Sequence, residues 1–178
     1  MDIRNAGSGN VGTVNSFLVT RSWVVGGAVL TVDLVKGMCA TALGTSLGGG
    51  TAIAGAAAGV ATVLGHNYPV WLRFHGGRGL APAAGAVLIM QWLIVPLWCL
   101  AWLCSFAALR SVNPANALAS MILLVLAAGV PPEYSSRLLG GADITVLRGF
   151  TIILMGLILL RHVEPVRDFF AGRKEKWQ

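Results

Sequence analysis

Long apolar stretches alternate with short glycine-rich polar segments along most of the chain. Four stretches are almost uncharged and approach the roughly 20 residues that cross a bilayer as a helix. They cover approximately residues 79–95, 97–109, 115–130 and 144–160. Pro96 stands between the first two, and a proline cannot continue the hydrogen-bond ladder of a helix, so a break is expected there. The pattern predicts four membrane helices in this part of the chain.

The region of residues 15–65 is equally apolar but is interrupted by the charged residues Arg21, Asp33 and Lys36. The run Gly48-Gly49-Gly50 is typical of a helix break. We therefore expect two shorter or broken helices in this region. Small residues fill residues 54–59, and such residues let membrane helices pack closely.

Composition supports a membrane location for the whole chain. Hydrophobic residues make up 56% of the sequence, charged residues only 11%, and the mean hydropathy is +0.74. A water-soluble domain of this size needs more charge on its surface. No period of 20 to 50 residues stands out. The prediction is an all-α, polytopic transmembrane helix bundle, one domain over residues 1–178, with about six membrane segments, some short or broken, and glycine-rich cytoplasmic loops.

The formal net charge of +6 comes from basic residues that stand singly in loops and near the carboxyl end. This distribution does not resemble a nucleic-acid-binding stripe. An even number of crossings before His66 and four after it would gather most of them on one side, namely Arg4, Arg73, Arg78, Arg110, Arg161, Arg167, Arg173, Lys174 and Lys176. The opposite loop, residues 131–143, holds Arg137 against Glu133 and Asp143. The positive-inside rule then places the motif-bearing loops in the cytoplasm.

Cysteine spacing and the chain start narrow the picture further. Cys39, Cys99 and Cys104 lie in apolar stretches without metal-ligand spacing, so we expect packing roles and neither a zinc site nor a disulfide framework. Residues 1–15 lack the apolar core of a secretory signal. The membrane helices themselves are expected to direct insertion.

The first segment that could take part in substrate binding or catalysis is the glycine-rich stretch of residues 2–15. Its glycines let the backbone turn N–H groups towards an anion without obstruction by side chains. Arg4 would add a permanently charged clamp, and Ser8 a hydroxyl donor. Taken alone, the segment also fits an ordinary flexible amino-terminal loop.

The second segment, residues 65–79, leads directly into an apolar helix through Gly76-Gly77-Arg78-Gly79. Backbone N–H groups at a helix start favour an anion, and Arg78 supplies a counter-charge, so the turn is a candidate phosphate cradle. The spacing differs from that of a nucleotide P-loop. The alternative is a basic interfacial loop with Tyr68 and Trp71 as membrane-belt anchors.

Three further residues carry charge or acid–base potential. His162 directly follows the last apolar stretch and could be a base, a phosphate ligand or an interfacial histidine. Asp33 and Lys36 lie inside an apolar stretch, where isolated charges are costly. Their spacing puts them one helical turn apart, so we expect a mutual ion pair or a polar cavity.

Together these segments resemble the membrane-bound acyl-phosphate:glycerol-3-phosphate acyltransferases of bacteria, the PlsY family. Residues 8–15, Ser-Gly-Asn-x-Gly-x-x-Asn, resemble that family's Gly-Ser-Gly-Asn-x-Gly-Ala-Thr-Asn element. Residues 33–37 resemble its Asp-x-x-Lys-Gly element, and residues 65–79 its Gly-His-x-x-Pro…Gly-Gly-Lys-Gly loop. His162 falls where the family's carboxyl-terminal motif begins. The resemblance covers nearly the whole chain.

The chain departs from the family pattern at several points. Family members usually carry a hydrophobic helix with a Ser-x-Pro element before the first motif, whereas the present sequence begins at the motif. Either the start of the sequence is misassigned or that helix is missing. Arg78 stands in place of the cradle lysine, and Pro82 in place of a threonine. In the last motif, the family's asparagine, isoleucine, arginine and glutamate are replaced by Pro165, Val166, Asp168 and Lys174.

The resemblance implies transfer of a fatty acyl group from acyl phosphate to the 1-hydroxyl of glycerol 3-phosphate, giving lysophosphatidic acid for phospholipid biosynthesis, in a bacterial inner membrane and without cofactor or metal. It implies catalytic roles for Ser8, Arg4 and His162. The substrate-binding residues implied are Gly7, Gly9, Asn10, Asn15, Lys36, His66, Gly76, Gly77, Arg78 and Gly79. Acyl phosphate, glycerol 3-phosphate and membrane lipids are the expected partners.

Two alternatives stay open at this point. The altered carboxyl-terminal motif also fits a divergent, non-catalytic family member that binds lipid or a partner protein. The charged pair Asp33 and Lys36 in a glycine-rich helical region also fits a small transporter, although no inverted pair of broken segments is seen.

Overall fold

The computed structural model describes residues 2–139 and 143–172. These residues form helices and no strand, which confirms the predicted all-α class. Short 3-10 turns η1 (Ile3–Asn5) and η2 (Val70–Leu72) accompany the α-helices. The α-helices are α1 (Thr13–Thr20), α2 (Trp23–Leu47), α3 (Ala52–Asn67), α4 (Leu80–Gln91), α5 (Ile94–Leu109), α6 (Val112–Gly129), α7 (Pro132–Leu139), α8 (Ile144–Leu160) and α9 (Val163–Phe170).

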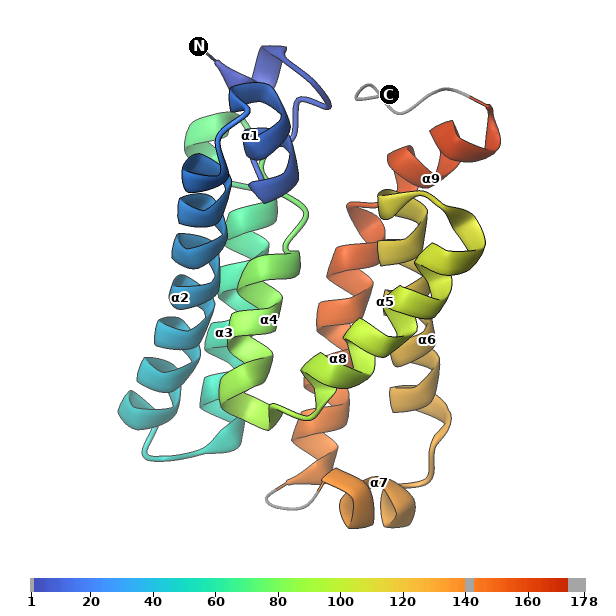
Figure 1. The fold of residues 1–178 in the computed structure, drawn as a ribbon. Helices are drawn as coiled ribbons and strands as arrows, with labels where there is room; N and C mark the ends of the chain where they lie inside the picture. Colours follow the sequence, from blue (N-terminus) through green and yellow to red (C-terminus); the bar gives the residue numbers. More distant parts are fainter. Residues whose placement is uncertain (1, 140–142, 173–178) are drawn as a thin grey trace.

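The helices form two groups that stand side by side (Figure 1). One group consists of α1 to α4, and the other contains α5, α6, α8 and α9. The amino-terminal loop, the connection between α3 and α4, the α5–α6 connection and α9 all lie at one end, here called the motif end (Figure 1). The turn after α2, the α4–α5 turn and α7 lie at the opposite end. This arrangement confirms the predicted grouping of the loops; Arg173, Lys174 and Lys176 lie outside the described residues.

Glycines allow α2 to pack closely against α4 and α3. A Cβ atom at Gly37 would overlap the carbonyl oxygen of Pro82, and one at Gly85 would overlap that of Leu34. On the α3 side, a Cβ atom at Gly55 would overlap the side chain of Thr45. The expectation that small residues mediate helix packing is therefore confirmed.

Two predicted helix boundaries need correction. The break expected at Pro96 lies earlier, between Gln91 and Ile94. Pro96 is the third residue of α5, where a missing N–H removes no intrahelical hydrogen bond, so the proline fits inside the helix. The break at residues 48–50 is confirmed, but α2 before it is one continuous helix of 25 residues. The expectation of short or broken helices in this region is thus wrong for α2.

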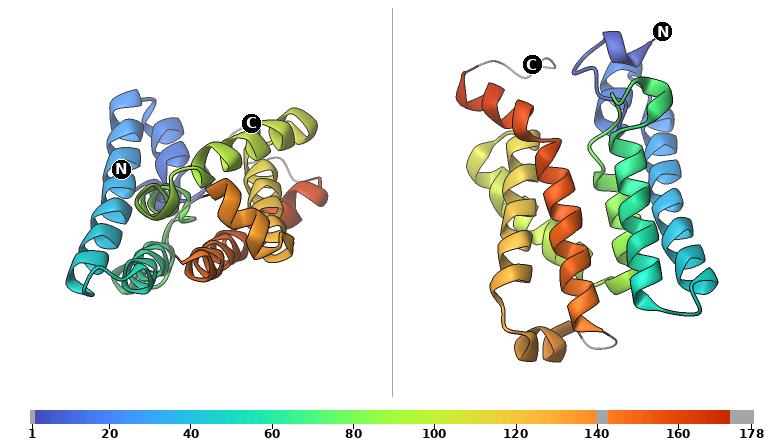
Figure 2. Two further views of the ribbon diagram at one scale, coloured as in Figure 1. Left: turned by 90° about the horizontal axis from the view of Figure 1, so that it is seen from below. Right: turned by 180° about the vertical axis from the view of Figure 1, so that it is seen from behind.

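The helices α2 and α6 are long and apolar enough to cross a membrane. The pair α8 and α9 passes the same test as a third span, bent by 51°. The helices α4 and α5 are apolar but shorter. Between the two groups, α3 and α4 pack against α8 (Figure 2). The core there includes Val63, Ala86, Phe150, Leu154 and Ile158. The prediction included short helices. Two of them, α3 and α4, form this core together with the longer helices.

Candidate active site

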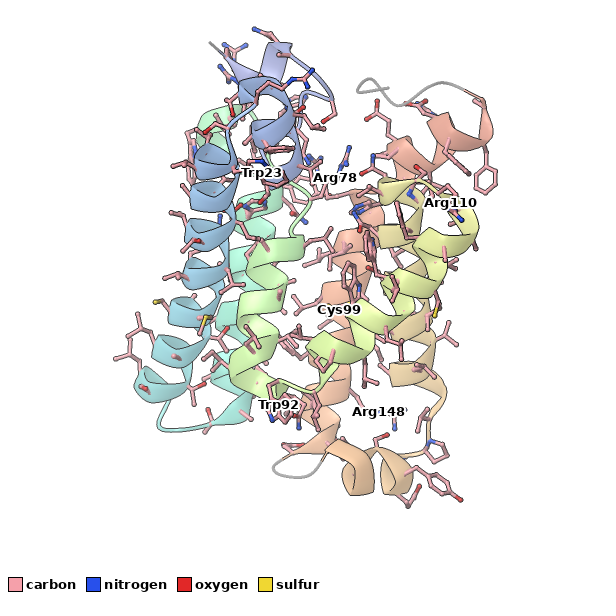
Figure 3. All side chains as sticks on the ribbon, viewed as in Figure 1. Trp23, Arg78, Trp92, Cys99, Arg110 and Arg148 are labelled. Carbon is pink, nitrogen blue, oxygen red and sulfur yellow. The ribbon has the colours of Figure 1, made fainter. Side chains whose placement is uncertain are left out.

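A cavity of about 430 Å³ opens at the motif end, between the two helix groups. Figure 3 shows Arg78 between the groups, at the end opposite to Arg148. The cavity combines residues from both groups. Its lining includes Ser8, Asn10, Gly12, Asn15, Asp33, His66, Arg78, Gly79, Leu80, Ala81, Trp98, Trp102, Asn113 and Asn116. Segments far apart in the sequence therefore meet in one place.

The first glycine loop is organised by the buried amide of Asn15, at the start of α1. Its Oδ1 accepts a hydrogen bond from the backbone N–H of Ser8 at 2.9 Å. Its Nδ2 donates to the carbonyl oxygens of Ile3, Ala6 and Asn10 at 3.1, 3.2 and 2.8 Å. One side chain thus satisfies four backbone groups of the loop, and Asn15 acts as its scaffold.

Positive φ angles of 58° at Gly7 and 71° at Gly9 let the loop turn sharply on both sides of Ser8. The Ser8 hydroxyl oxygen lies 3.4 Å from the backbone nitrogen of Asn10, which donates to it. Asn10 in turn accepts from the backbone N–H of Gly12. Because the Ser8 oxygen serves as an acceptor inside the loop, its O–H proton can be donated to a ligand in the cavity.

Arg4 lies away from the cavity lining. Its guanidinium pairs with the carboxylate of Asp2 at 2.7 Å, and both side chains are exposed. Hydrogen bonds from Arg4 lower the pKa of Asp2 to about 2. The catalytic role of Arg4 stays a prediction.

Asp33, Lys36 and His66 form a polar cluster between α2 and the end of α3. The Nζ of Lys36 lies 2.6 Å from Oδ1 of Asp33 and 2.7 Å from Nδ1 of His66. The expected ion pair is therefore present, with His66 as a third member that the sequence did not connect to it. Asp33 and His66 line the 430 Å³ cavity, and all three line a second cavity of about 400 Å³ beside it.

The second glycine loop is folded tightly against the end of α3. The backbone N–H groups of Gly76 and Gly77 donate to the carbonyl oxygens of Asn67 and His66 at 3.3 and 3.1 Å. A Cβ atom at Gly77 would overlap the His66 ring, which explains the glycine there. Since these two N–H groups serve the loop itself, the backbone donors available to an anion are those at the start of α4, after Gly79 with its φ of 80°.

The side chain of Arg78 donates a hydrogen bond to Oδ1 of Asn113, in the first turn of α6. Asn113 is buried and lines the cavity. No role for Asn113 was predicted from the sequence. The sequence feature that could have identified Asn113 is the occurrence of Asn113, Asn116 and Ser120 on one face of an otherwise apolar helix.

Arg161, directly after α8, binds the backbone of the second glycine loop. Its Nε donates to the carbonyl oxygen of Gly77 at 3.0 Å, and a terminal nitrogen donates to that of Gly76 at 2.9 Å. The guanidinium also lies 5.2 Å from the ring centroid of Tyr68. The carboxyl-terminal motif therefore contacts the second glycine loop through Arg161. No role in the site was predicted for this residue.

His162 is fully buried just beyond the end of α8. Its Nδ1 lies 2.7 Å from the carbonyl oxygen of Ile158, and its Nε2 is buried without a hydrogen-bond partner among the described residues. The imidazole does not line the cavity. Its catalytic role stays a prediction.

The inner side of the cavity is apolar. Trp98 and Trp102 contribute to its wall from α5, and Trp98 donates to the hydroxyl of Ser120 at 3.1 Å. A second, almost wholly apolar hollow of about 130 Å³ adjoins it and shares Leu80, Ala84 and Trp98 with the main cavity. Over residues 2–139 and 143–172, no cluster of histidine, cysteine and acidic side chains suited to a metal ion is found.

A family profile described as glycerol-3-phosphate acyltransferase matches residues 1–172. The chain belongs to this family. The glycerol-3-phosphate acyltransferase of Thermotoga petrophila is 32% identical over 180 residues, covering 99% of this chain and 83% of that protein. The protein of the same name from Pseudomonas aeruginosa is 35% identical over 175 residues, covering 97% of this chain and 84% of the relative.

Solved structures of the family are similar in fold as well. The crystal structure of PlsY (YgiH), an integral membrane glycerol 3-phosphate acyltransferase, in its glycerol 3-phosphate form, gives a TM-score of 0.75 at 31% identity, covering 98% of this chain and 81% of that one. Its lysophosphatidic acid form gives 0.72 at 30% identity, covering 94% and 79%. The present acyltransferase-family chain is thus an integral membrane helix bundle.

Proposed function

We propose that this protein transfers a fatty acyl group from acyl phosphate to the 1-hydroxyl of glycerol 3-phosphate and releases lysophosphatidic acid and inorganic phosphate. The observation that carries the proposal is the cavity at the motif end, where the Ser8 loop, Arg78 and the start of α4 meet. Family membership and the likeness to PlsY in its substrate and product forms support the acyl-transfer activity. Neither the non-catalytic nor the transporter alternative gains support from the same observations.

The phosphate of glycerol 3-phosphate is assigned to Arg78 and the first turn of α4. Arg78 provides a permanent charge, and the helix start provides N–H donors with a favourable dipole. Pro82, the third residue of α4, has no N–H, so the helix offers donors only before it. This makes the guanidinium the main source of binding energy for the phosphate.

The phosphate head of the acyl donor is assigned to Ser8 and the first glycine loop, on the opposite wall of the cavity. Ser8 lines the cavity whereas Arg4 pairs with Asp2, so Ser8 carries this contact. The apolar hollow beside Leu80 and Trp98 would take the first part of the acyl chain. The remainder of the acyl chain can lie in the surrounding lipid, because the acyl chain and the hydrocarbon interior of a bilayer are both apolar.

In the reaction, the 1-hydroxyl oxygen attacks the acyl carbonyl carbon, and the bond from that carbon to the phosphate oxygen breaks. Acyl phosphate is an activated mixed anhydride, so the protein mainly needs to hold both anions close and to stabilise the charge that develops. The hydroxyl proton passes to a phosphate oxygen of a substrate. This acceptor fits the site better than His162, whose imidazole lies outside the cavity lining.

The basic residues at the motif end support a cytoplasmic location for the cavity in a bacterial inner membrane. Arg78 and Arg110 lie at this end (Figure 3). Arg73 belongs to the connection between α3 and α4, and Arg161 directly follows α8, and both of these segments lie at the same end (Figure 1). The positive-inside rule then gives the orientation. Both phosphate-bearing substrates would reach the cavity from the cytoplasm.

The test uses the purified protein in detergent or lipid with palmitoyl phosphate and glycerol 3-phosphate. Phosphate release and lysophosphatidic acid formation are both expected, with large losses in Ser8→Ala and Arg78→Ala. Arg78→Ala should raise the KM for glycerol 3-phosphate, and Ser8→Ala the KM for palmitoyl phosphate. If Arg78→Ala changed only the KM for palmitoyl phosphate, the assignment of the two phosphates would be wrong. Absence of both products from the wild-type protein would contradict the activity.

A further inference from the structure

The inner face of α6 carries three buried polar side chains in a helix that is otherwise apolar on this side: Asn113, Asn116 and Ser120. Their spacing places them in one row along the helix. The two outer members have defined partners. Asn113 accepts from Arg78, and Ser120 accepts from the indole N–H of Trp98 at 3.1 Å.

The middle member, Asn116, is different. Its side chain is only 8% exposed, yet within the part of the chain that the structure describes its amide forms no hydrogen bond. The amide atoms of Asn116 are not among the fully buried unpartnered side-chain atoms of the described residues, so they keep access to the cavity and their hydrogen-bonding capacity is available to a ligand. Asn116 also lines the 430 Å³ cavity. A side chain of this kind points to a polar group of a ligand as its missing partner.

We propose that Asn116 is a specificity-determining residue that binds the C2 hydroxyl of glycerol 3-phosphate. The proposal rests on the proposed function, and in particular on Arg78 as the phosphate ligand. Asn113, the partner of Arg78, fixes where the phosphate lies relative to α6. With a rise of about 1.5 Å per residue, Asn116 lies about 4.5 Å further along the helix than Asn113, within reach of a three-carbon backbone.

The chemistry of the amide supports the C2 hydroxyl over other groups. A primary amide presents one acceptor and two donor hydrogens, and a hydroxyl is both a donor and an acceptor, so both functions of Asn116 can be used. The acyl carbonyl oxygen would use only the donor. The reacting C1 hydroxyl must give up its proton, so a neutral amide is a poor partner for it during the reaction. Asn116 thus recognises the C2 hydroxyl of the substrate, whereas Arg78 binds its phosphate.

The experiment compares glycerol 3-phosphate with propane-1,3-diol monophosphate, which keeps the phosphate and the reacting hydroxyl but lacks the C2 hydroxyl. The wild-type protein should prefer glycerol 3-phosphate in kcat/KM by about 10- to 100-fold, the effect expected for one hydrogen bond in a buried site. Asn116→Ala should lose about this factor with glycerol 3-phosphate and change little with the analogue. The discrimination between the two acceptors would then collapse.

Ser120→Ala is the matched control, since it lies one turn further along the same face and its hydroxyl already has a partner. It should affect both acceptors alike. The proposal is overturned if the wild-type protein does not discriminate, or if Asn116→Ala lowers kcat/KM equally for both. Calorimetric titration of both acceptor phosphates into the detergent-solubilised protein, without acyl donor, gives the same comparison in Kd. This binding measurement decides the role of Asn116 even if no acyl transfer were observed.

Discussion

The Nε of Arg161, at the end of α8, donates to the carbonyl oxygen of Gly77 at 3.0 Å, across 84 residues of sequence. A second guanidinium nitrogen holds the carbonyl of Gly76. The loop that carries Arg78 is thereby fixed from the far helix group, and the geometry of the cavity depends on a residue that does not line it. Arg161 is therefore a positioning residue for the glycine loop.

Replacement of Arg161 tests this role. Arg161→Ala removes two charge-assisted hydrogen bonds, each of which typically contributes about 1.5–3 kcal/mol. We expect kcat/KM for glycerol 3-phosphate to fall by at least tenfold, and Arg161→Lys, which cannot make both bonds in the same plane, to recover only part of the loss. Hydrogen exchange of the amides in residues 74–79 should accelerate in Arg161→Ala. Unchanged exchange together with unchanged kinetics would contradict the positioning role.

Asn15 offers a test of the first loop. Asn15→Ala removes the four hydrogen bonds that hold this loop, and we expect a loss of unfolding free energy of about 2–4 kcal/mol together with loss of activity. Asn15→Asp keeps the acceptor for the Ser8 N–H but replaces the donors to three carbonyl groups, so it should be equally damaging. Thermal unfolding in detergent and acyl-transfer rates measure both effects. An active and stable Asn15→Asp protein would show that the loop needs only the Ser8 contact.

Close packing of α2 against α4 predicts a contrast between two glycines of the same helix. Gly37→Ala would bring a methyl group against the carbonyl of Pro82, and we expect destabilisation of about 1–3 kcal/mol and a distorted cavity, because overpacking forces the backbones apart. Gly27→Ala is the control, since nothing lies within 4 Å of its added Cβ. The control should keep or slightly raise the unfolding temperature. Equal behaviour of the two variants would argue against close packing at Gly37.

Much of the architecture could be predicted because apolar runs and glycine breaks act locally. The helical class, the break at residues 48–50 and the pair of Asp33 with Lys36 follow from such local patterns. The position of Pro96 misled the prediction because a proline is compatible with the first turn of a helix as well as with a break.

The site was less predictable because its decisive contacts are made between distant segments. The loops with Ser8 and Arg78 could be found through their glycines, whose local conformations leave a sequence signature. Asn113 and Arg161 act on the second loop through tertiary hydrogen bonds. The polar face of α6 marks Asn113 as unusual, but nothing local in the sequence identifies the partner of either residue. For these contacts, helix packing decides the partner, and spacing along the sequence carries no such information.

The adjacency of Lys36 and Gly37 has a consequence for the tolerance of α2 to insertions. Neighbouring residues of a helix differ by about 100° in direction, so Lys36 can reach His66 while Gly37 meets Pro82. A single residue inserted between Gly27 and Asp33 would rotate the upstream half of α2 against this pair. Either the polar cluster or the contacts of α1 with α2 would then be lost, whatever residue was inserted. This stretch of α2 is thus constrained in length as well as in composition.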